Sequence, residues 1–141
     1  MSPESREDDH ILADELGKLA QKGAAGARFA ARHMPNNTYE LTQTVAIDLE
    51  RVIAGARNVI TGQGREVREE RPDGGFLIKG VVGAGLFNMN PAVVTIRLTP
   101  LDSGQVAIAV TGTANEGLIK QRAGEKAATR IAEALLVEIG Q

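Results

Sequence analysis

The residue types that most often carry chemistry are scarce in this sequence and lie far apart. Cysteine is absent, which excludes disulfides, thiolate catalysis and cysteine-containing zinc sites. The two histidines, His10 and His33, both lie in the N-terminal part of the chain, without a cluster of carboxylates at ligand spacing. We therefore expect no metal site and no cofactor, and we interpret His33 as a surface residue at the end of a helix.

Serine and the acidic residues offer no better arrangement for catalysis. Ser103 lies in a turn that needs a small polar residue, and no Gly-x-Ser-x-Gly motif is present. Glu69 and Glu70 are neighbours on a predicted strand, so they point to opposite faces and cannot act as a carboxylate pair. Asp48 directly precedes a helical pattern, where its side chain is expected to cap the helix. No catalytic residue can be nominated.

A glycine-rich segment at 80–85, Gly-Val-Val-Gly-Ala-Gly, superficially resembles a phosphate-binding loop. Such a loop must lead into a helix whose N–H groups meet the anion. Here the segment lies in or just after a predicted strand, and another strand follows. We interpret its glycines as lying on one face of a bent or bulged strand that a neighbour approaches closely.

The loop 85–91 is unusually apolar for a connection between strands. It contains Leu86 and Phe87, and loops often carry binding residues. One interpretation is that Phe87 closes the end of the sheet. The other is that the loop forms the lip of a binding site in which Asn88 and Asn90 orient a ligand.

The elements that must position these residues follow from the spacing of apolar side chains. Alternation predicts strands, and gaps of three and four predict helices. Gly62 or Gly64 is expected to end the first helix in a left-handed conformation, and Asn115 to cap the last one. The expected elements are a strand at 39–47, a helix at 49–60, strands at 65–71, 76–84, 92–99 and 105–112, and a closing helix at 118–139. The charged strand at 65–71 is expected at an edge.

Short turns between the later strands predict antiparallel neighbours, and both helices are expected on one face of the sheet. The fold class is therefore α+β, with the order β-α-β-β-β-β-α. The inward side chains are Phe76, Ile78, Val82, Val94, Ile96, Leu98, Val106, Ile108 and Val110. The opposite face holds small or polar residues, Lys79, Gly83, Thr95, Arg97, Ala107, Ala109 and Thr111, and is expected to be wet or covered by something flat.

An alanine-rich arm, residues 1–38, is expected to precede this domain, which spans 39–141. Gaps of three and four predict a helix from Ile11 towards Met34, interrupted near its glycines and ended at Pro35. Residues 1–15 hold six acids and one arginine, whereas residues 16–34 hold only basic charges. We expect the thin helix to pack on the flat face of a sheet, its own or a partner's.

The composition excludes several classes of partner and location. A formal charge of −2 and 3% aromatic residues argue against nucleic-acid binding. No uninterrupted apolar stretch reaches the length of about 18 residues that a membrane helix needs, so no membrane insertion is expected. The acidic start does not resemble a secretory signal, and with the lack of cysteine it favours a cytoplasmic location.

The element order over 39–139 resembles the helix-grip arrangement of START-like (Bet v 1-like) and TATA-binding-protein-like domains. The START-like resemblance implies an apolar ligand between the closing helix and the sheet, with Leu118, Ile131 and Leu135 facing Phe76 and Ile96. The TATA-binding resemblance implies phenylalanine wedges on the open face, where this chain has alanine and threonine instead.

We therefore expect a non-enzymatic binding or interaction module, for a small apolar ligand or a protein partner. The alternative is a structural protein that forms a homodimer through the arm and the open sheet face. An enzyme acting on a small substrate is the least favoured interpretation.

Overall fold

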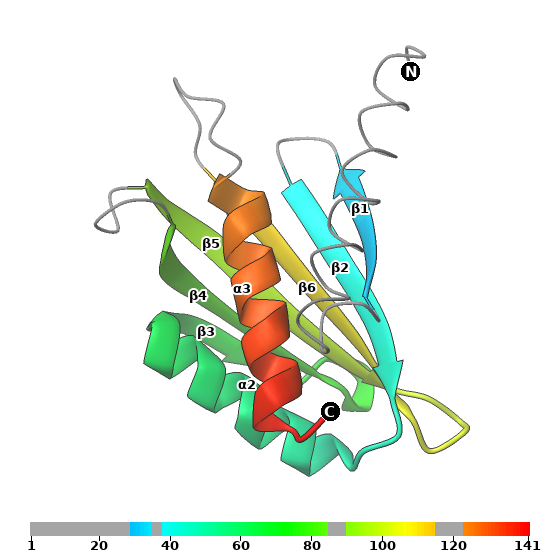
Figure 1. Cartoon of the computed structure of the whole chain (residues 1–141). Helices are drawn as coiled ribbons and strands as arrows, with labels where there is room; N and C mark the ends of the chain where they lie inside the picture. Colours follow the sequence, from blue (N-terminus) through cyan, green and yellow to red (C-terminus); the bar gives the residue numbers. More distant parts are fainter. Residues whose placement is uncertain (1–28, 35–37, 85–89, 115–122) are drawn as a thin grey trace, which may run out of the picture.

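The computed structural model describes residues 29–34, 38–84, 90–114 and 123–141. These residues form one antiparallel sheet and two helices, so the α+β prediction is confirmed (Figure 1). The strands are β1 (Ala30–Met34), β2 (Thr38–Val45), β3 (Gly64–Glu70), β4 (Phe76–Ala84), β5 (Asn90–Pro100) and β6 (Val106–Ala114), and the helices are α2 (Leu49–Gln63) and α3 (Ala123–Glu138).

The six strands lie in the order β1-β2-β6-β5-β4-β3, and every neighbouring pair is antiparallel. Helix α2 carries the chain from β2 to the far edge, where β3 begins. The chain then returns strand by strand until β6 pairs with β2. The turn between β3 and β4 is a short 3-10 turn at Pro72–Gly74, as the Pro-Asp-Gly sequence favours.

Both helices lie on the same side of the sheet, as predicted (Figure 1). Alternate residues of the four central strands point towards them and are buried, including all nine predicted inward side chains. Val52 and Ile60 of α2 and Ile131 and Leu135 of α3 are also buried in this core. Each fully buried side chain of this size stabilises the fold by about 1.5–3 kcal/mol.

Helix α3 approaches the sheet most closely at Gly112 of β6. A Cβ atom built on Gly112 would lie 2.0 Å from the backbone oxygen of Gly124, at the start of α3. Only glycine allows this contact between backbones. The first turn of α3 is thereby held close to β6 and its neighbours.

The two ends of α2 differ from what the sequence predicts. Asp48 occupies the N-cap position, but its side chain makes no capping hydrogen bond; its backbone oxygen accepts from the N–H groups of Arg51 and Val52. The predicted left-handed glycine is wrong, because Gly64 has an extended φ of −171°. A Cβ on Gly64 would lie 2.2 Å from the backbone oxygen of Val81, so glycine is needed there for strand pairing.

The prediction of a helix reaching Met34 is wrong for its last residues. Ala30–Met34 form the edge strand β1, which pairs with β2 from Ala30↔Thr42 to Met34↔Thr38. The described sheet therefore starts with a strand that the order β-α-β-β-β-β-α did not contain. The backbone of this segment is satisfied by β2 rather than by its own helical turns.

Strand β3 forms the other edge of the sheet, as its charge predicted. A register shift between Glu66 and Arg68 leaves Val67 as a bulge, 52% exposed. Bulges and crowded charges both discourage pairing with a further strand.

Candidate functional site

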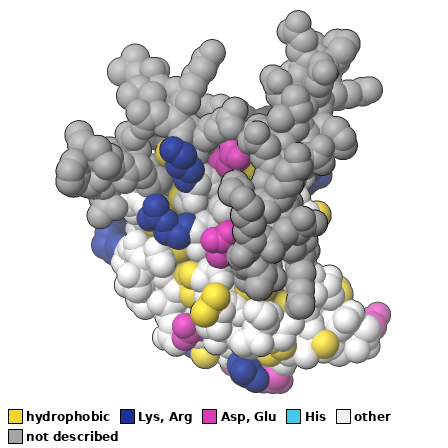
Figure 2. Space-filling view, in the orientation of Figure 1, with side chains coloured by type: hydrophobic (Ala, Val, Ile, Leu, Met, Phe, Trp, Pro, Cys, Tyr) yellow, Lys and Arg dark blue, Asp and Glu magenta, His cyan; other side chains and the backbone are white. Residues whose placement is uncertain are grey.

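The face of the sheet opposite the two helices, here called the open face, carries the most accessible candidate site. It presents the side chains that alternate with the core residues. Figure 2 shows the helix side instead, where basic and acidic side chains are interspersed. The open face lies behind that view.

A hollow of about 280 Å³ lies on the open face where β2, β6 and β5 run side by side. Ala107 and Ala109 of β6 form its floor, because they are small and lie between longer side chains of the two neighbouring strands. Thr42 and Thr44 line it on the β2 side, and Arg97 and Thr99 on the β5 side, with Gln43 and Ile108 completing the lining. The hollow thus offers hydroxyl groups, methyl groups and one guanidinium to a ligand.

Positive charge is concentrated on this face. The strand register places Arg32, Arg65, Arg68, Lys79 and Arg97 there against only two acids, Glu40 and Glu70. Arg32 pairs with Glu40 at 2.9 Å, and Arg68 pairs with Glu70 at 3.5 Å. The other three cations make no ion pair with any residue that the structure describes.

Threonine is the commonest polar residue between these charges. Thr38 and Thr113 exchange a hydrogen bond of 2.9 Å across β2 and β6. Thr42, Thr44 and Thr99 are exposed and make no side-chain hydrogen bond within the described chain. These hydroxyl groups are free to donate to an acceptor on a partner.

A second group of polar side chains is partly buried on the helix side, between β1, β2 and α3. His33 lies on β1 opposite Tyr39, with ring centroids 4.8 Å apart. The Nε2 atom of His33 lies 4.0 Å from Oε2 of Glu125 on α3. Both of these atoms, the hydroxyl of Tyr39 and the hydroxyl of Thr129 are shielded from solvent and have no hydrogen-bond partner. His33 lies on strand β1, so the predicted helix end is wrong, while its side chain remains 30% exposed.

Burial raises the pKa of the Tyr39 hydroxyl well above its usual value, and the nearby charge of Glu125 adds to the effect. Tyr39 is 2% exposed, so a substrate in solvent does not reach its hydroxyl. The group has the residue types of an acid–base site but lacks access. Bound water is the ordinary way to satisfy such buried atoms.

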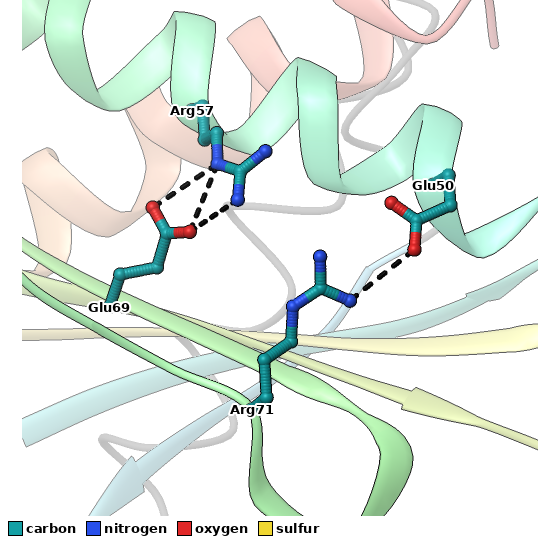
Figure 3. Close-up of polar contacts among 4 residues, drawn as sticks. All are labelled: Glu50, Arg57, Glu69 and Arg71. Carbon is teal, nitrogen blue, oxygen red and sulfur yellow. Dashed lines mark hydrogen bonds and ion pairs between the residues drawn. The ribbon is translucent and has the colours of Figure 1, made fainter.

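Charged side chains between α2 and β3 act as a structural link. Nε of Arg57 lies 3.1 Å from both carboxylate oxygens of Glu69, and Nη1 of Arg71 lies 3.3 Å from Glu50 (Figure 3). The hydrogen bond from Arg57 holds the pKa of Glu69 below its usual value. Both guanidinium groups also lie over the buried ring of Phe76, at 5.3 and 5.4 Å from its centroid.

The structure does not bring together the residues that were considered from the sequence as candidates for catalysis or phosphate binding. Glu69 faces α2 and Glu70 lies on the opposite side, as alternation predicted. Ser103 donates to Gln105 within its turn, at 3.2 Å. The segment 80–85 lies in β4 as far as Ala84, but Gly80 faces α2 whereas Gly83 alternates to the open side, so the prediction of one shared glycine face is wrong.

Several predicted residues lie outside the described part of the chain. They are His10, the loop residues 85–89, and Asn115 and Leu118 before α3. The other residues that the helix-grip resemblance placed around a ligand, Ile131, Leu135, Phe76 and Ile96, are all packed in the apolar core with 0% exposure.

No protein-family model matches the chain, and no curated protein matches it. The helix-grip resemblance therefore stays a likeness in element order. Within the described residues, no three or more of His, Asp and Glu lie together in a way that could hold a metal ion. Neither described helix has the length and apolar character needed to cross a membrane.

Alternation had placed Lys79, Arg97, Ala107 and Ala109 on the open face, and this prediction is confirmed. The buried group around Tyr39 was missed, because nothing local in the sequence shows that β1 brings His33 beside it. A weak signal exists in retrospect. Ala31, His33, Tyr39 and Leu41 alternate on either side of a Pro-Asn-Asn turn, which is the pattern of a hairpin.

Proposed function

We propose that the protein is a non-enzymatic interaction module that binds its partner through the open face of the sheet. The observation that carries this proposal is the hollow beside Arg97, on a face that neither described helix covers. On the helix side, the strands and both helices pack into a continuous apolar core. A partner therefore has better access to the open face than to the helix side of the sheet.

The composition of the open face supports binding of a polar partner. Ala107 and Ala109 let a partner's atoms approach the strands closely, while Thr42, Thr99 and Arg97 supply donors around them. Arginine recognises carboxylates or similar anions through paired hydrogen bonds. A small apolar ligand is less well served, because the hollow is open and bordered by hydroxyl groups and charge.

The test is an amide-shift titration on the isotope-labelled full chain with four probes. They are an oligoglutamate peptide, a glycine–serine peptide, an oligolysine peptide and a short thymidine oligonucleotide. We expect at least one probe to shift the amides of Thr42, Arg97, Thr99 and Ala109 together. No response of these amides to any probe, or a response gathered on the helices, would contradict the proposal.

Two variants make the titration specific. Ala109→Trp fills the hollow and should abolish the shifts. Ala54→Trp places the same side chain at an exposed position of α2 and should leave them unchanged. Equal behaviour of both variants would mean that the hollow is not the binding surface.

A further inference from the structure

The three cations of the open face that form no ion pair with a described residue lie in a diagonal row across β5, β4 and β3. Arg97 lies opposite Leu77, Lys79 lies two residues further along β4, and Arg65 lies opposite Val81. Each cation is therefore two residues further along the sheet than its neighbour on the adjacent strand. Diagonal neighbours on one face of a sheet lie about 7–8 Å apart, so the row spans about 15 Å.

This row, Arg97–Lys79–Arg65, makes the face locally positive on a chain whose formal charge is −2. Because Arg32 and Arg68 are already paired with Glu40 and Glu70, the row is the excess. Such a charge distribution favours an anionic partner.

The chain itself contains a matching segment. Residues 1–15 hold Glu4, Glu7, Asp8, Asp9, Asp14 and Glu15 against the single Arg6. In an extended chain, alternate side chains are about 6.6–6.8 Å apart on one side. Glu7 and Asp9 would thus be spaced almost as two neighbouring cations of the row are, whereas the alternate positions beside them, Ser5 and Ile11, carry no charge.

We propose that residues 1–15 of a second copy lie across the open face, so that two copies associate by exchanging their acidic segments. This inference rests on the proposed function and names the partner of the same surface. The carboxylates of Glu7 and Asp9 pair with the neighbouring cations Arg97 and Lys79, and the hydroxyls of Thr42 and Thr99 donate to the segment. A two-fold exchange makes this contact twice, which strengthens the dimer without any new surface.

The charges of the residues after the acidic segment favour a segment from a second copy over the chain's own segment. Residues 16–28 contain Lys18, Lys22 and Arg28 and no acid. To bring residues 1–15 onto its own open face, the chain would draw this basic stretch towards a face that already has excess positive charge. In an exchange between copies, this stretch would instead cross from one domain to the other and need not run along its own positive face.

An acidic polypeptide is also favoured over nucleic acid. The row has only three free cations, and no aromatic side chain of the described open face is available for bases to stack on. Binding of the thymidine oligonucleotide in place of the acidic segment would contradict the inference.

The first experiment is sedimentation equilibrium on the full chain and its charge variants. We expect a concentration-dependent dimer that weakens when NaCl rises from about 0.05 to about 0.5 M, because exposed charges are screened over about 10 Å at 0.1 M salt. The variant Arg97→Glu/Lys79→Glu should weaken dimerisation at least about tenfold, the equivalent of about 1.4 kcal/mol. The control Arg51→Glu/Lys126→Glu makes the same charge change on exposed helix residues and should dimerise normally.

The decisive experiment exchanges the charges between the segment and the row. The variant Glu7→Lys/Asp9→Lys should also fail to dimerise alone. A mixture with Arg97→Glu/Lys79→Glu should form a mixed dimer, because one of its two contacts keeps the native charges and the other has both charges reversed. A full chain that stays monomeric at every concentration, or a mixture that does not associate, overturns the inference.

A peptide titration separates this failure from failure of the proposed function. The receptor is the full chain with all six acids of residues 1–15 changed to amides, and the probe is a synthetic peptide of residues 1–15. Shifts of the Arg97, Lys79 and Thr42 amides are expected. Should the peptide leave these amides unmoved while another probe shifts them, the segment is wrong and the binding face stands. Should no probe move them, both proposals fail.

Discussion

On the helix side of the sheet, the buried positions of strands β4, β5 and β6 carry apolar side chains or glycine. On the open side, the same strands contribute mainly threonine, alanine, lysine and arginine, together with Leu77, Val81 and Val93. Phe76 and Lys79 lie three residues apart on one strand, yet Phe76 is 0% exposed in the core and Lys79 faces away from the helices. Strand alternation alone separates the two environments.

The two faces of the sheet place different constraints on which side chains they accept. The helix side is fixed by packing, because a change of one methylene group in a filled core alters stability. The open side is free of that constraint, so its cations and its floor of alanine are not required by the fold. Residues that packing does not demand are the ones through which a partner can be recognised.

The comparison predicts its largest effect at Phe76. Phe76→Ala should lower the free energy of unfolding by about 3–5 kcal/mol, because it removes a fully buried ring and leaves a cavity beneath α2. Val93→Ala on the open face is the matched control, and since Val93 is 38% exposed it should cost less than about 1 kcal/mol. Urea denaturation of both variants measures the contrast. Similar losses would mean that the open face is covered as tightly as the core.

A smaller effect is expected at Gly112, where α3 meets the sheet. Gly112→Ala places a Cβ atom 2.0 Å from the backbone oxygen of Gly124, so α3 must shift, at a cost of about 1–3 kcal/mol. Gly62→Ala makes the same chemical change in α2, where nothing lies within 4 Å of the new atom. It should stabilise the protein by up to about 1 kcal/mol through helix propensity. Thermal unfolding of both variants should therefore shift in opposite directions.

How far the sequence predicts this molecule depends on whether the signal is local. The core was predictable because Val94, Ile96 and Leu98 alternate strictly within one strand. Strand β1 could not be predicted in this way, because Ala30, Ala31 and Met34 have small or flexible side chains that also fit the apolar face of a helix. What decides the matter is the pairing of Ala30–Met34 with β2, a contact between separate segments.

The candidate site shows the same limit. Alternation placed Arg97 and Lys79 on the open face, but their alignment with Arg65 depends on which strands are neighbours. It also depends on the bulge at Val67, which puts Arg65 and Arg68 on one face although they are three residues apart. No local pattern specifies a bulge of this kind.

A substitution at Tyr39 tests whether its buried hydroxyl contributes to the stability of the helix side. Because its buried hydroxyl has no partner, Tyr39→Phe should leave the free energy of unfolding at neutral pH unchanged or raise it by up to about 1 kcal/mol. A loss of about 1–3 kcal/mol would instead show that the hydroxyl binds water or a ligand.

The pH dependence of the same variant gives a second measurement. The pKa of Tyr39 is raised in the folded state, so between its ordinary value of about 10 and the raised value only the unfolded chain releases the proton. Stability should therefore fall as the pH rises above about 10. Tyr39→Phe should lose less stability over this range in urea denaturation, and equal slopes would mean that the hydroxyl is not buried.

The smallest effect is expected at Glu69, where the covered side meets solvent. The hydrogen bond from Arg57 lowers the pKa of Glu69 in the folded state, so its contribution is present above the ordinary pKa of about 4.3 and is lost as the pH falls through the lowered value. Glu69→Gln should therefore flatten the acid side of the stability profile. Arg57→Gln should flatten it in the same way, and the double variant should add nothing, because each change removes the same contact. Additive effects would show that the side chains of Arg57 and Glu69 act separately.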